Sequence, residues 1–164
     1  KSKHENIEFQ LLGHLDTASP TAISKEQMDI WVADGYVKYL GSSDDVRVEI
    51  AQANCVVLPS FYREGTPRIL LESASMEKPI ITTDNIGCRD VVDDGINGYL
   101  CEVKNSKDLA NKMEMMLNLS DIERNGMGKA GRVKMINEFD EKIVIDKYLF
   151  TVENIFNLKP VTDC

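Results

Sequence analysis

The sequence predicts an α/β fold, a Rossmann-like three-layer parallel sheet with helices on both faces. Short apolar runs alternate with longer helical patterns from residue 7 to about residue 156, the order expected when helical crossovers join parallel strands. The clearest run, residues 55–58, is apolar throughout and ends at Pro59, as expected for a strand that is buried on both faces of the sheet. A helix-start pattern follows this run at Thr66 and Pro67.

Five strands and six helices are expected from these patterns. The strands are residues 7–12, 37–40, 55–58, 79–83 and 99–101. The residues expected to cap or begin the successive helices are Ser24 (a capping-box pattern with Gln27), Ser43 or Asp44, Thr66, Ser106, Ser120 (a capping box with Glu123) and Asp140.

Composition indicates a soluble globular protein of one domain, with 43% hydrophobic and 28% charged residues among 164. The formal net charge of −8 argues against binding to nucleic acid or to an anionic membrane. No transmembrane run or signal peptide is recognised, and four widely spaced cysteines favour reduced thiols, so we expect a cytoplasmic protein. The expected organisation is a polar leader over residues 1–6, the domain over 7–156 and a tail over 157–164. Because the chain begins at Lys1 close to its first strand, we expect an excised piece of a longer protein.

The helix expected at Thr66 creates a phosphate site. Thr66 suits the N-cap and Pro67 the first helical position, so the free N–H groups of Arg68 and Ile69 should point out of the carboxyl edge of the sheet. Hydrogen bonding and the helix dipole both favour an anion there. Gly65 lets a ligand approach the backbone closely.

Two carboxylates bracket this phosphate site, Glu64 in the loop before it and Glu72 nearly two turns inside the helix. Each carboxylate can accept two hydrogen bonds, so the pair suits a ligand with hydroxyl groups on both sides of its phosphates, such as a nucleotide sugar. On their own, two glutamates at a helix would more often form a solvated face. The strand at residues 55–58, followed by Gly65, the Thr66 cap and Pro67 in the expected order, favours a binding site over a solvated face.

Glu64, seven intervening residues and Glu72, with Gly-x-Pro after the first glutamate, resemble the donor-site motif of retaining family 4 glycosyltransferases of the GT-B fold. The resemblance implies roles for the following residues: Glu64, Gly65 and Thr66 at the transferred sugar; Pro67, Arg68, Ile69 and Gly13 at the diphosphate; Glu72 at the ribose; and Leu40, Gly41, Gly87 and Arg89 lining the site. His14 is a further candidate to line the site, because it follows Gly13 at the carboxyl end of a strand, where ligands gather in open α/β sheets.

The resemblance also implies the reaction and the partners. A sugar would move from a nucleotide-sugar donor, UDP-linked by expectation, to a glycan or polyprenyl-linked acceptor in capsule, O-antigen or other surface polysaccharide synthesis. No metal and no cofactor are expected, and contact with the membrane would be peripheral, at its cytoplasmic face. The acceptor domain and the opening strand and helix of the donor domain are missing from residues 7–156, so we expect no activity from this chain alone.

Several features depart from this interpretation or compete with it. Glu77 stands where the family usually has glycine in a left-handed position, and Asp90 where it usually has glutamate. Two alternatives are a nucleotide-sugar epimerase of the same fold and a non-catalytic flavodoxin-like module. Gly126-x-Gly128-x-x-Gly131 matches a dinucleotide fingerprint, but no strand precedes it, so we do not interpret it as a nucleotide site.

The last helix carries apolar residues at helical spacing, namely Ile145, Tyr148, Leu149, Val152 and Phe156. Two interpretations are open. The stripe could pack on the core of this domain, or it could cross to a partner domain, as the resemblance implies.

Overall fold

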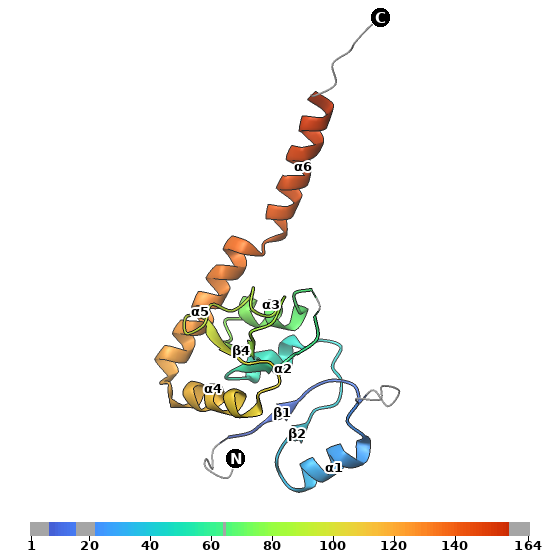
Figure 1. The fold of residues 1–164 in the computed structure, drawn as a ribbon, viewed down its shortest axis with the longest axis vertical. Helices are drawn as coiled ribbons and strands as arrows, with labels where there is room; N and C mark the ends of the chain where they lie inside the picture. The colour runs from blue at the N-terminus through green and yellow to red at the C-terminus, as the bar shows by residue number, and fades with distance from the viewer. Residues whose placement is uncertain (1–6, 16–21, 64, 158–164) are drawn as a thin grey trace, which may run out of the picture. The chain divides into compact units, whose positions relative to one another are not determined.

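The computed structural model describes residues 7–15, 22–63 and 65–157 (Figure 1). The chain divides into two compact units, Lys1–Val46 and Arg47–Cys164, and each is described here by itself. His4, Glu64 and Cys164 lie outside the described residues. The expectation of one domain over residues 7–156 stays a prediction.

The first unit is a parallel two-stranded sheet with one helical crossover. β1 (Gln10–Leu11) pairs with β2 (Lys38–Tyr39), and α1 (Lys25–Ala33) connects them. The Ser24 hydroxyl accepts a hydrogen bond from the Gln27 backbone N–H at 3.2 Å, which confirms the predicted cap. Both strands are shorter than the apolar runs that predicted them.

The second unit contains a parallel three-stranded sheet in the order β3–β4–β5. Its elements are α2 (Arg47–Gln52), β3 (Val56–Leu58), α3 (Arg68–Ser75), β4 (Ile80–Thr83), β5 (Gly98–Cys101), α4 (Ser106–Asn118), α5 (Asp121–Glu138) and α6 (Glu141–Asn157). Parallel strands joined by helices confirm the predicted α/β fold class.

Helices cover both faces of this sheet (Figure 1). Ile80 packs in a cluster with side chains of α3 and α5, whereas Ile81, the next residue of β4, packs against α4. β4 is therefore the strand that is buried on both faces. The prediction that residues 55–58 are buried in this way is wrong, because β3 is only half-buried and, in the described chain, pairs with a strand on one side alone.

Two helices, α2 and α3, begin later than predicted, and α4 begins one residue earlier. α3 begins at Arg68 rather than Thr66, because Pro67 has an extended backbone (φ −63°, ψ 125°) and takes the N-cap position itself. α4 is capped by Asn105 rather than Ser106, since the Asn105 side chain accepts from the Asp108 N–H at 3.0 Å. α2 begins at Arg47, whereas Ser43 or Asp44 was predicted to cap it.

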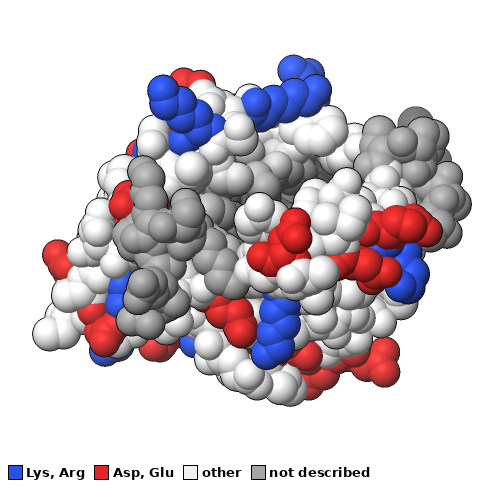
Figure 2. Space-filling view, turned by 90° about the horizontal axis from the view of Figure 1, so that it is seen from below, with Lys and Arg blue, Asp and Glu red and all other residues white. Residues whose placement is uncertain are grey.

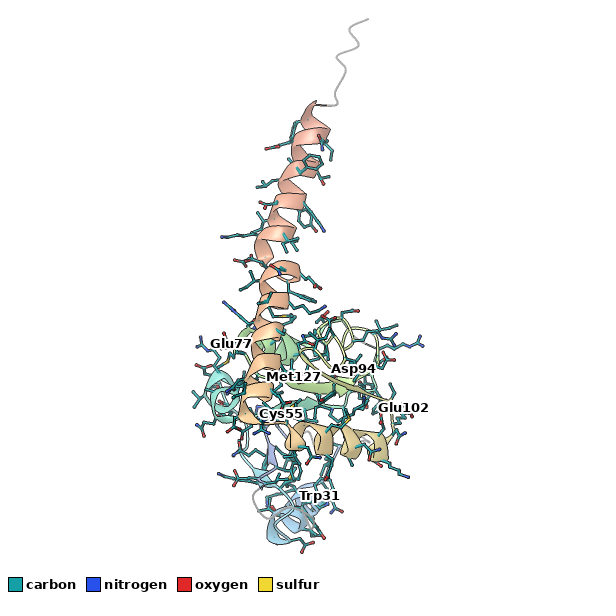
Figure 3. The ribbon with its side chains drawn as sticks, turned by 90° about the vertical axis from the view of Figure 1, so that its left-hand side faces the viewer. Trp31, Cys55, Glu77, Asp94, Glu102 and Met127 are labelled. Carbon is teal, nitrogen blue, oxygen red and sulfur yellow. The ribbon has the colours of Figure 1, made fainter. Side chains whose placement is uncertain are left out.

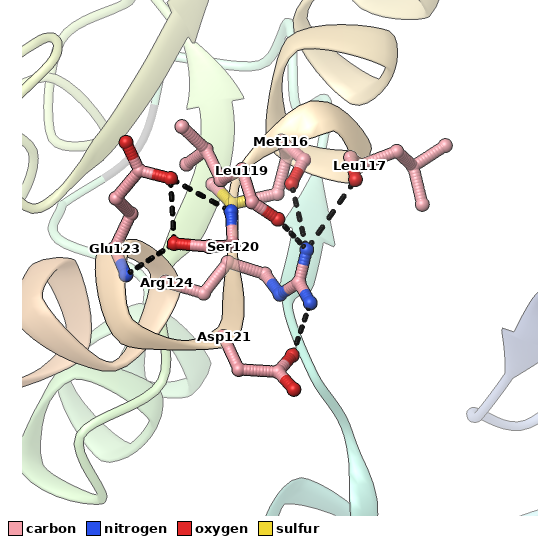
Figure 4. A network of polar contacts seen from close by, with 7 residues as sticks. All are labelled: Met116, Leu117, Leu119, Ser120, Asp121, Glu123 and Arg124. Atoms are coloured by element: carbon pink, nitrogen blue, oxygen red, sulfur yellow. Dashed lines mark hydrogen bonds and ion pairs between the residues drawn. The ribbon is translucent and has the colours of Figure 1, made fainter.

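The predicted capping box of α5 is confirmed, and it forms part of a larger polar network (Figure 4). The Ser120 N–H donates to the Glu123 carboxylate at 2.7 Å, and the Glu123 N–H donates to the Ser120 hydroxyl at 3.3 Å. The Ser120 hydroxyl also donates to the Glu123 carboxylate at 2.7 Å, and this hydrogen bond, together with the one from the Ser120 N–H, lowers the pKa of Glu123. The Arg124 guanidinium donates to backbone carbonyls at the end of α4 and pairs with Asp121, so it closes the α4–α5 turn.

The apolar face of α6 is exposed in the described structure. Ile145 is 49%, Tyr148 71% and Phe156 72% exposed. Figure 3 shows the side chains of this helix extending outward along its length. The interpretation that this stripe packs on the core of the domain is therefore wrong.

Glu77 adopts the left-handed conformation that the comparison with glycine anticipated, with φ of 58° directly after the C-cap residue Met76. A side chain is unfavourable there. We expect Glu77→Gly to raise the free energy of unfolding by about 0.5–1 kcal/mol, the relief of backbone strain less the larger entropy of an unfolded glycine. Urea denaturation measures this effect. Glu77→Ala, which removes the charge and keeps the strain, should give no such gain, and an equal gain would contradict the explanation.

Candidate functional site

The N-terminus of α3 has no side-chain cap. Pro67 makes no capping hydrogen bond, whereas Ser24, Asn105 and Ser120 each cap their helix with a side-chain oxygen. α3 follows β3, so its first turn lies at the carboxyl edge of the parallel sheet, where ligands gather in open α/β folds. In the described part of the chain, the first N–H groups of α3 are therefore left for an anion.

The backbone before α3 is open. A Cβ atom built on Gly65 meets no atom within 4 Å, and Gly65 itself is exposed. Thr66 and Pro67 are half-buried. A ligand can thus approach the backbone at Gly65, as the sequence predicts. Glu64, the predicted sugar-binding carboxylate, lies outside the described residues.

Glu72 lies one turn beyond Arg68 on α3, and the two side chains form an ion pair of 3.3 Å between Nη2 and Oε1. The Arg68 side chain is 89% exposed and that of Glu72 33% exposed. Exposed pairs of this kind contribute only about 0–1 kcal/mol. A ligand that offers a phosphate to Arg68 and hydroxyl groups to Glu72 can therefore replace the pair at little cost.

The end of β4 and the loop after it form hydrogen bonds with the end of β3 and the loop after that strand. Thr82 Oγ1 donates to the Leu58 carbonyl at 2.8 Å, Asn85 Nδ2 donates to the Tyr62 carbonyl at 2.9 Å, and the Thr83 hydroxyl donates to the Ser60 carbonyl. No motif in the sequence marks these three side chains as supports of the site. The signal was present, since buried hydroxyl and amide groups at the end of an apolar strand need partners.

Gly87 and Arg89, two predicted site-lining residues, belong to this loop after β4. Gly87 is buried with φ of 83°, a conformation that favours glycine. Arg89 donates to the Asp84 carbonyl at 2.9 Å and pairs with the Asp84 carboxylate at 3.1 Å. Arg89 is thus held within its own loop.

The remaining predicted site residues lie in the first unit and come together there. The Gly13 N–H donates to the Gly41 carbonyl at 2.8 Å, and the Tyr39 hydroxyl donates to the Gly13 carbonyl at 2.7 Å. Leu40 and the exposed His14 are neighbours in sequence of these glycines. The structure therefore groups Gly13, His14, Leu40 and Gly41 at the carboxyl ends of β1 and β2.

The described residues include three cysteines. Burial raises the pKa of the Cys55 thiol to about 12 and also raises the pKa of Cys101. Cys55, Cys88 and Cys101 are free thiols, as predicted. Among residues 7–15, 22–63 and 65–157, no group of three or more His, Cys, Asp or Glu side chains is placed to hold a metal ion.

Both signs of charge occur on the surface. On the face shown in Figure 2, acidic and basic side chains lie next to each other rather than in separate patches. With a formal net charge of −8, attraction of an anionic ligand depends on local groups such as Arg68 and the start of α3.

Comparison with known proteins identifies the family. Residues 1–119, well over half of the chain, match the family model described as "Glycosyl transferases group 1". The chain belongs to this family. Membership favours the predicted transferase over the two alternatives, an epimerase and a flavodoxin-like module.

Two curated relatives of this group 1 glycosyltransferase chain are bacterial. The chain is 33% identical over 147 residues to the N,N'-diacetylbacillosaminyl-diphospho-undecaprenol alpha-1,3-N-acetylgalactosaminyltransferase of Campylobacter jejuni, covering 88% of the chain and 36% of that protein. It is 26% identical over 156 residues to the capsular polysaccharide biosynthesis glycosyltransferase CapM of Staphylococcus aureus, covering 95% of the chain and 39% of that protein. The chain thus spans less than two fifths of each relative.

A solved structure shares the fold of this group 1 glycosyltransferase chain. Anabaena Alr3699/HepE, in complex with UDP, matches with a TM-score of 0.70 and 21% identity over 79% of this chain and 35% of that one. No helix in the described ranges is both long and apolar enough to span a membrane.

Proposed function

We propose that this chain is the carboxyl-terminal, donor-binding domain of a retaining family 4 glycosyltransferase of the GT-B fold. The observation that carries the proposal is the uncapped start of α3 at the carboxyl edge of the sheet, with Arg68 in its first turn and Glu72 one turn on. A diphosphate fits the free N–H groups and the Arg68 guanidinium. Glu72 accepts hydrogen bonds from the ribose hydroxyls, and Glu64 is assigned to the transferred sugar.

The proposed donor is a UDP-linked hexose or hexosamine. The fold similarity to a protein solved with UDP supports the choice of nucleotide. The hydroxyl-bearing groups on both sides of a diphosphate also match a site with a carboxylate on either side of its anion-binding turn. Gly87 and Arg89, which follow β4 in the same unit as α3, line the diphosphate site in this proposal. The roles that the resemblance gives to Gly13, His14, Leu40 and Gly41 stay predictions.

The proposed acceptor is a glycan or a polyprenyl-linked saccharide of a bacterial surface polysaccharide, such as capsule or O-antigen. The names of the two relatives support this class, since one includes a diphospho-undecaprenol group and the other capsular polysaccharide biosynthesis. The full-length protein would then work in the cytoplasm, peripherally at the inner face of the membrane.

Catalysis in this proposal is electrostatic. Negative charge develops on the donor diphosphate as the sugar leaves, and the prearranged N–H groups at the start of α3, together with Arg68, stabilise it. No metal takes part. Because acceptor binding is assigned to another part of the full-length protein, the chain alone should bind the donor without transferring sugar.

Calorimetric titration of the chain with UDP, GDP and ADP tests this function. We expect selective binding of UDP and a loss of about tenfold in affinity for Glu72→Gln, because a neutral amide is a weaker acceptor for the ribose hydroxyls than a carboxylate. Glu153→Gln, at an exposed position of α6, serves as the matched control and should bind UDP normally. Unchanged affinity in Glu72→Gln would remove Glu72 from the site.

A further inference from the structure

We propose that Thr83 and Asn85 are positioning residues, which hold the backbone between β3 and α3 in the conformation that binds the transferred sugar of the donor. This inference rests on the proposed function. Neither residue is assigned a contact with the donor. Both act through the anchored segment, residues 59–63, which leads directly into the turn assigned to the sugar and the diphosphate.

The main-chain ladder between β3 and β4 ends at Leu58, whose partner in register is Thr82. The next residue, Pro59, has no N–H group and so cannot donate to a neighbouring strand. No described residue between Leu58 and Arg68 belongs to a helix or strand. The carbonyl groups of the anchored segment therefore need partners from outside the ladder.

Side chains at the end of β4 and in the loop after it supply these partners. Three of them donate to carbonyls of the neighbouring chain: Thr82 to Leu58 at 2.8 Å, Thr83 to Ser60, and Asn85 Nδ2 to Tyr62 at 2.9 Å. The acceptors are two residues apart, the spacing at which carbonyl groups of an extended chain face the same neighbour. The anchored segment thus continues the course of β3 past the end of the ladder.

Both positioning residues are buried, and their donor groups have fixed directions. Thr83 is 1% and Asn85 9% exposed. The Asn85 Oδ1 atom accepts a hydrogen bond from the Ile86 N–H at 2.9 Å, so both ends of the carboxamide are engaged. A buried polar group that loses its partner is costly, because water does not readily replace that partner. The anchored segment is therefore held in place before any ligand binds.

Contacts on the surface of the anchored segment are weaker. The ring centroids of Phe61 and Tyr62 are 4.2 Å apart, and the Lys104 Nζ lies 4.5 Å from the centroid of Phe61. Both rings are exposed, and cation–π contacts at exposed sites contribute little. Rotation of these side chains can break the contacts without moving the backbone. The buried hydrogen bonds of Thr83 and Asn85 therefore determine where the backbone lies.

The start of α3 is anchored separately. Leu70 and Ala74 are 0% exposed and pack in one cluster with Ile80 of β4 and Met135 of α5. Loosening the anchored segment therefore leaves the residues assigned to the diphosphate and the ribose in place, but it frees the turn assigned to the sugar. Affinity for the sugar part of the donor should fall, because the turn must then be ordered on binding, while affinity for UDP is kept.

Calorimetric titration of the 164-residue chain with UDP and with three UDP-sugars tests this inference. The sugars are UDP-glucose, UDP-N-acetylglucosamine and UDP-N-acetylgalactosamine, and the one that binds the parent chain most tightly is used for the variants. The measured quantity is its dissociation constant divided by that of UDP. We expect Thr83→Val and Asn85→Ala each to raise this ratio about fivefold. Thr83→Ser, which keeps the hydroxyl group, should restore the parent ratio.

Thr82→Val is the matched control. Thr82 is 0% exposed and loses a hydrogen bond of the same kind, but its acceptor, Leu58, is also held by the main-chain ladder. Urea denaturation should show a similar loss of stability in Thr82→Val and Thr83→Val, while Thr82→Val keeps the parent ratio.

The inference is overturned if Thr83→Val leaves the ratio unchanged. It is also overturned if Thr82→Val raises the ratio equally, since loss of stability would then explain the effect. Failure of the proposed function is seen separately, as an absence of UDP binding to the parent chain.

Discussion

Replacing Gly128 with alanine is expected to destabilise the second unit severely. A Cβ atom built on Gly128 would lie 1.9 Å from the Glu77 carbonyl oxygen and 2.6 Å from its carbonyl carbon. Gly128 is buried on α5, and the obstacle is backbone at the end of α3 rather than a flexible side chain. The clash between the alanine Cβ and the Glu77 carbonyl can be relieved only if α3 and α5 move apart. We therefore expect a loss of about 3 kcal/mol or more in the free energy of unfolding.

Gly126→Ala provides the control for this prediction, because it makes the same change in the same helix. A Cβ atom at Gly126 meets nothing within 4 Å. Alanine is the better helix former by about 1 kcal/mol, so this variant should be slightly more stable than the parent chain. Urea denaturation followed by far-UV circular dichroism compares the two variants. Similar stability in both would show that α3 and α5 do not pack as closely as described.

The glycines of α5 have a packing role that the sequence alone does not predict. Because no strand precedes it, Gly126-x-Gly128-x-x-Gly131 does not predict a nucleotide site, and the structure shows that these residues lie inside α5. The sequence could not show why they are there. Gly128 faces the Glu77 carbonyl and Gly131 faces Ala74, so the glycines allow α3 and α5 to approach closely. That reason depends on contacts between residues about fifty positions apart.

Local signals predicted most of the fold. The alternation of apolar runs and helical patterns predicted the five strands, and the Ser120–Glu123 capping box predicted the start of α5. Both patterns depend only on residues that are close together in the sequence. Strand lengths and three helix starts, those of α2, α3 and α4, were predicted less accurately. Because the backbone of Pro67 is extended, α3 begins at Arg68, two residues after Thr66. The general preference for proline at the first helical position does not predict this shift.

Properties that depend on tertiary structure could not be predicted. The partial burial of β3, the exposed face of α6 and the stacking of Phe61 on Tyr62 each require knowledge of which elements meet. The place of the anion-binding turn after β3 follows from the sequence because the turn is one continuous stretch, residues 65–69, but its cap is Pro67 rather than the predicted Thr66. The pairing of Arg68 with Glu72 also follows from their spacing of four residues.

Replacing Arg68 with proline is expected to abolish most donor binding without disturbing the helix. Arg68 is the first residue of α3, where proline is favoured and its N–H has no helical partner. The preceding residue, Pro67, already has the extended backbone (ψ 125°) that a following proline requires. The substitution therefore removes one N–H donor and the guanidinium from the proposed diphosphate site while α3 stays folded.

Arg68→Ala separates the two losses, since it removes the guanidinium and keeps the N–H. We expect Arg68→Ala to weaken UDP binding about fivefold, as for loss of one exposed charged contact. Arg68→Pro should weaken it by about a further tenfold, which reflects the loss of a backbone hydrogen bond to a charged phosphate. Far-UV circular dichroism and thermal unfolding confirm that both variants are folded.

The ratio of UDP dissociation constants between Arg68→Pro and Arg68→Ala, measured by calorimetry on the chain, tests most directly whether the uncapped start of α3 holds the donor diphosphate. Our account predicts a ratio of about ten or more, with both variants folded. A ratio near one would contradict it, because the N–H of Arg68 would then contribute nothing to binding.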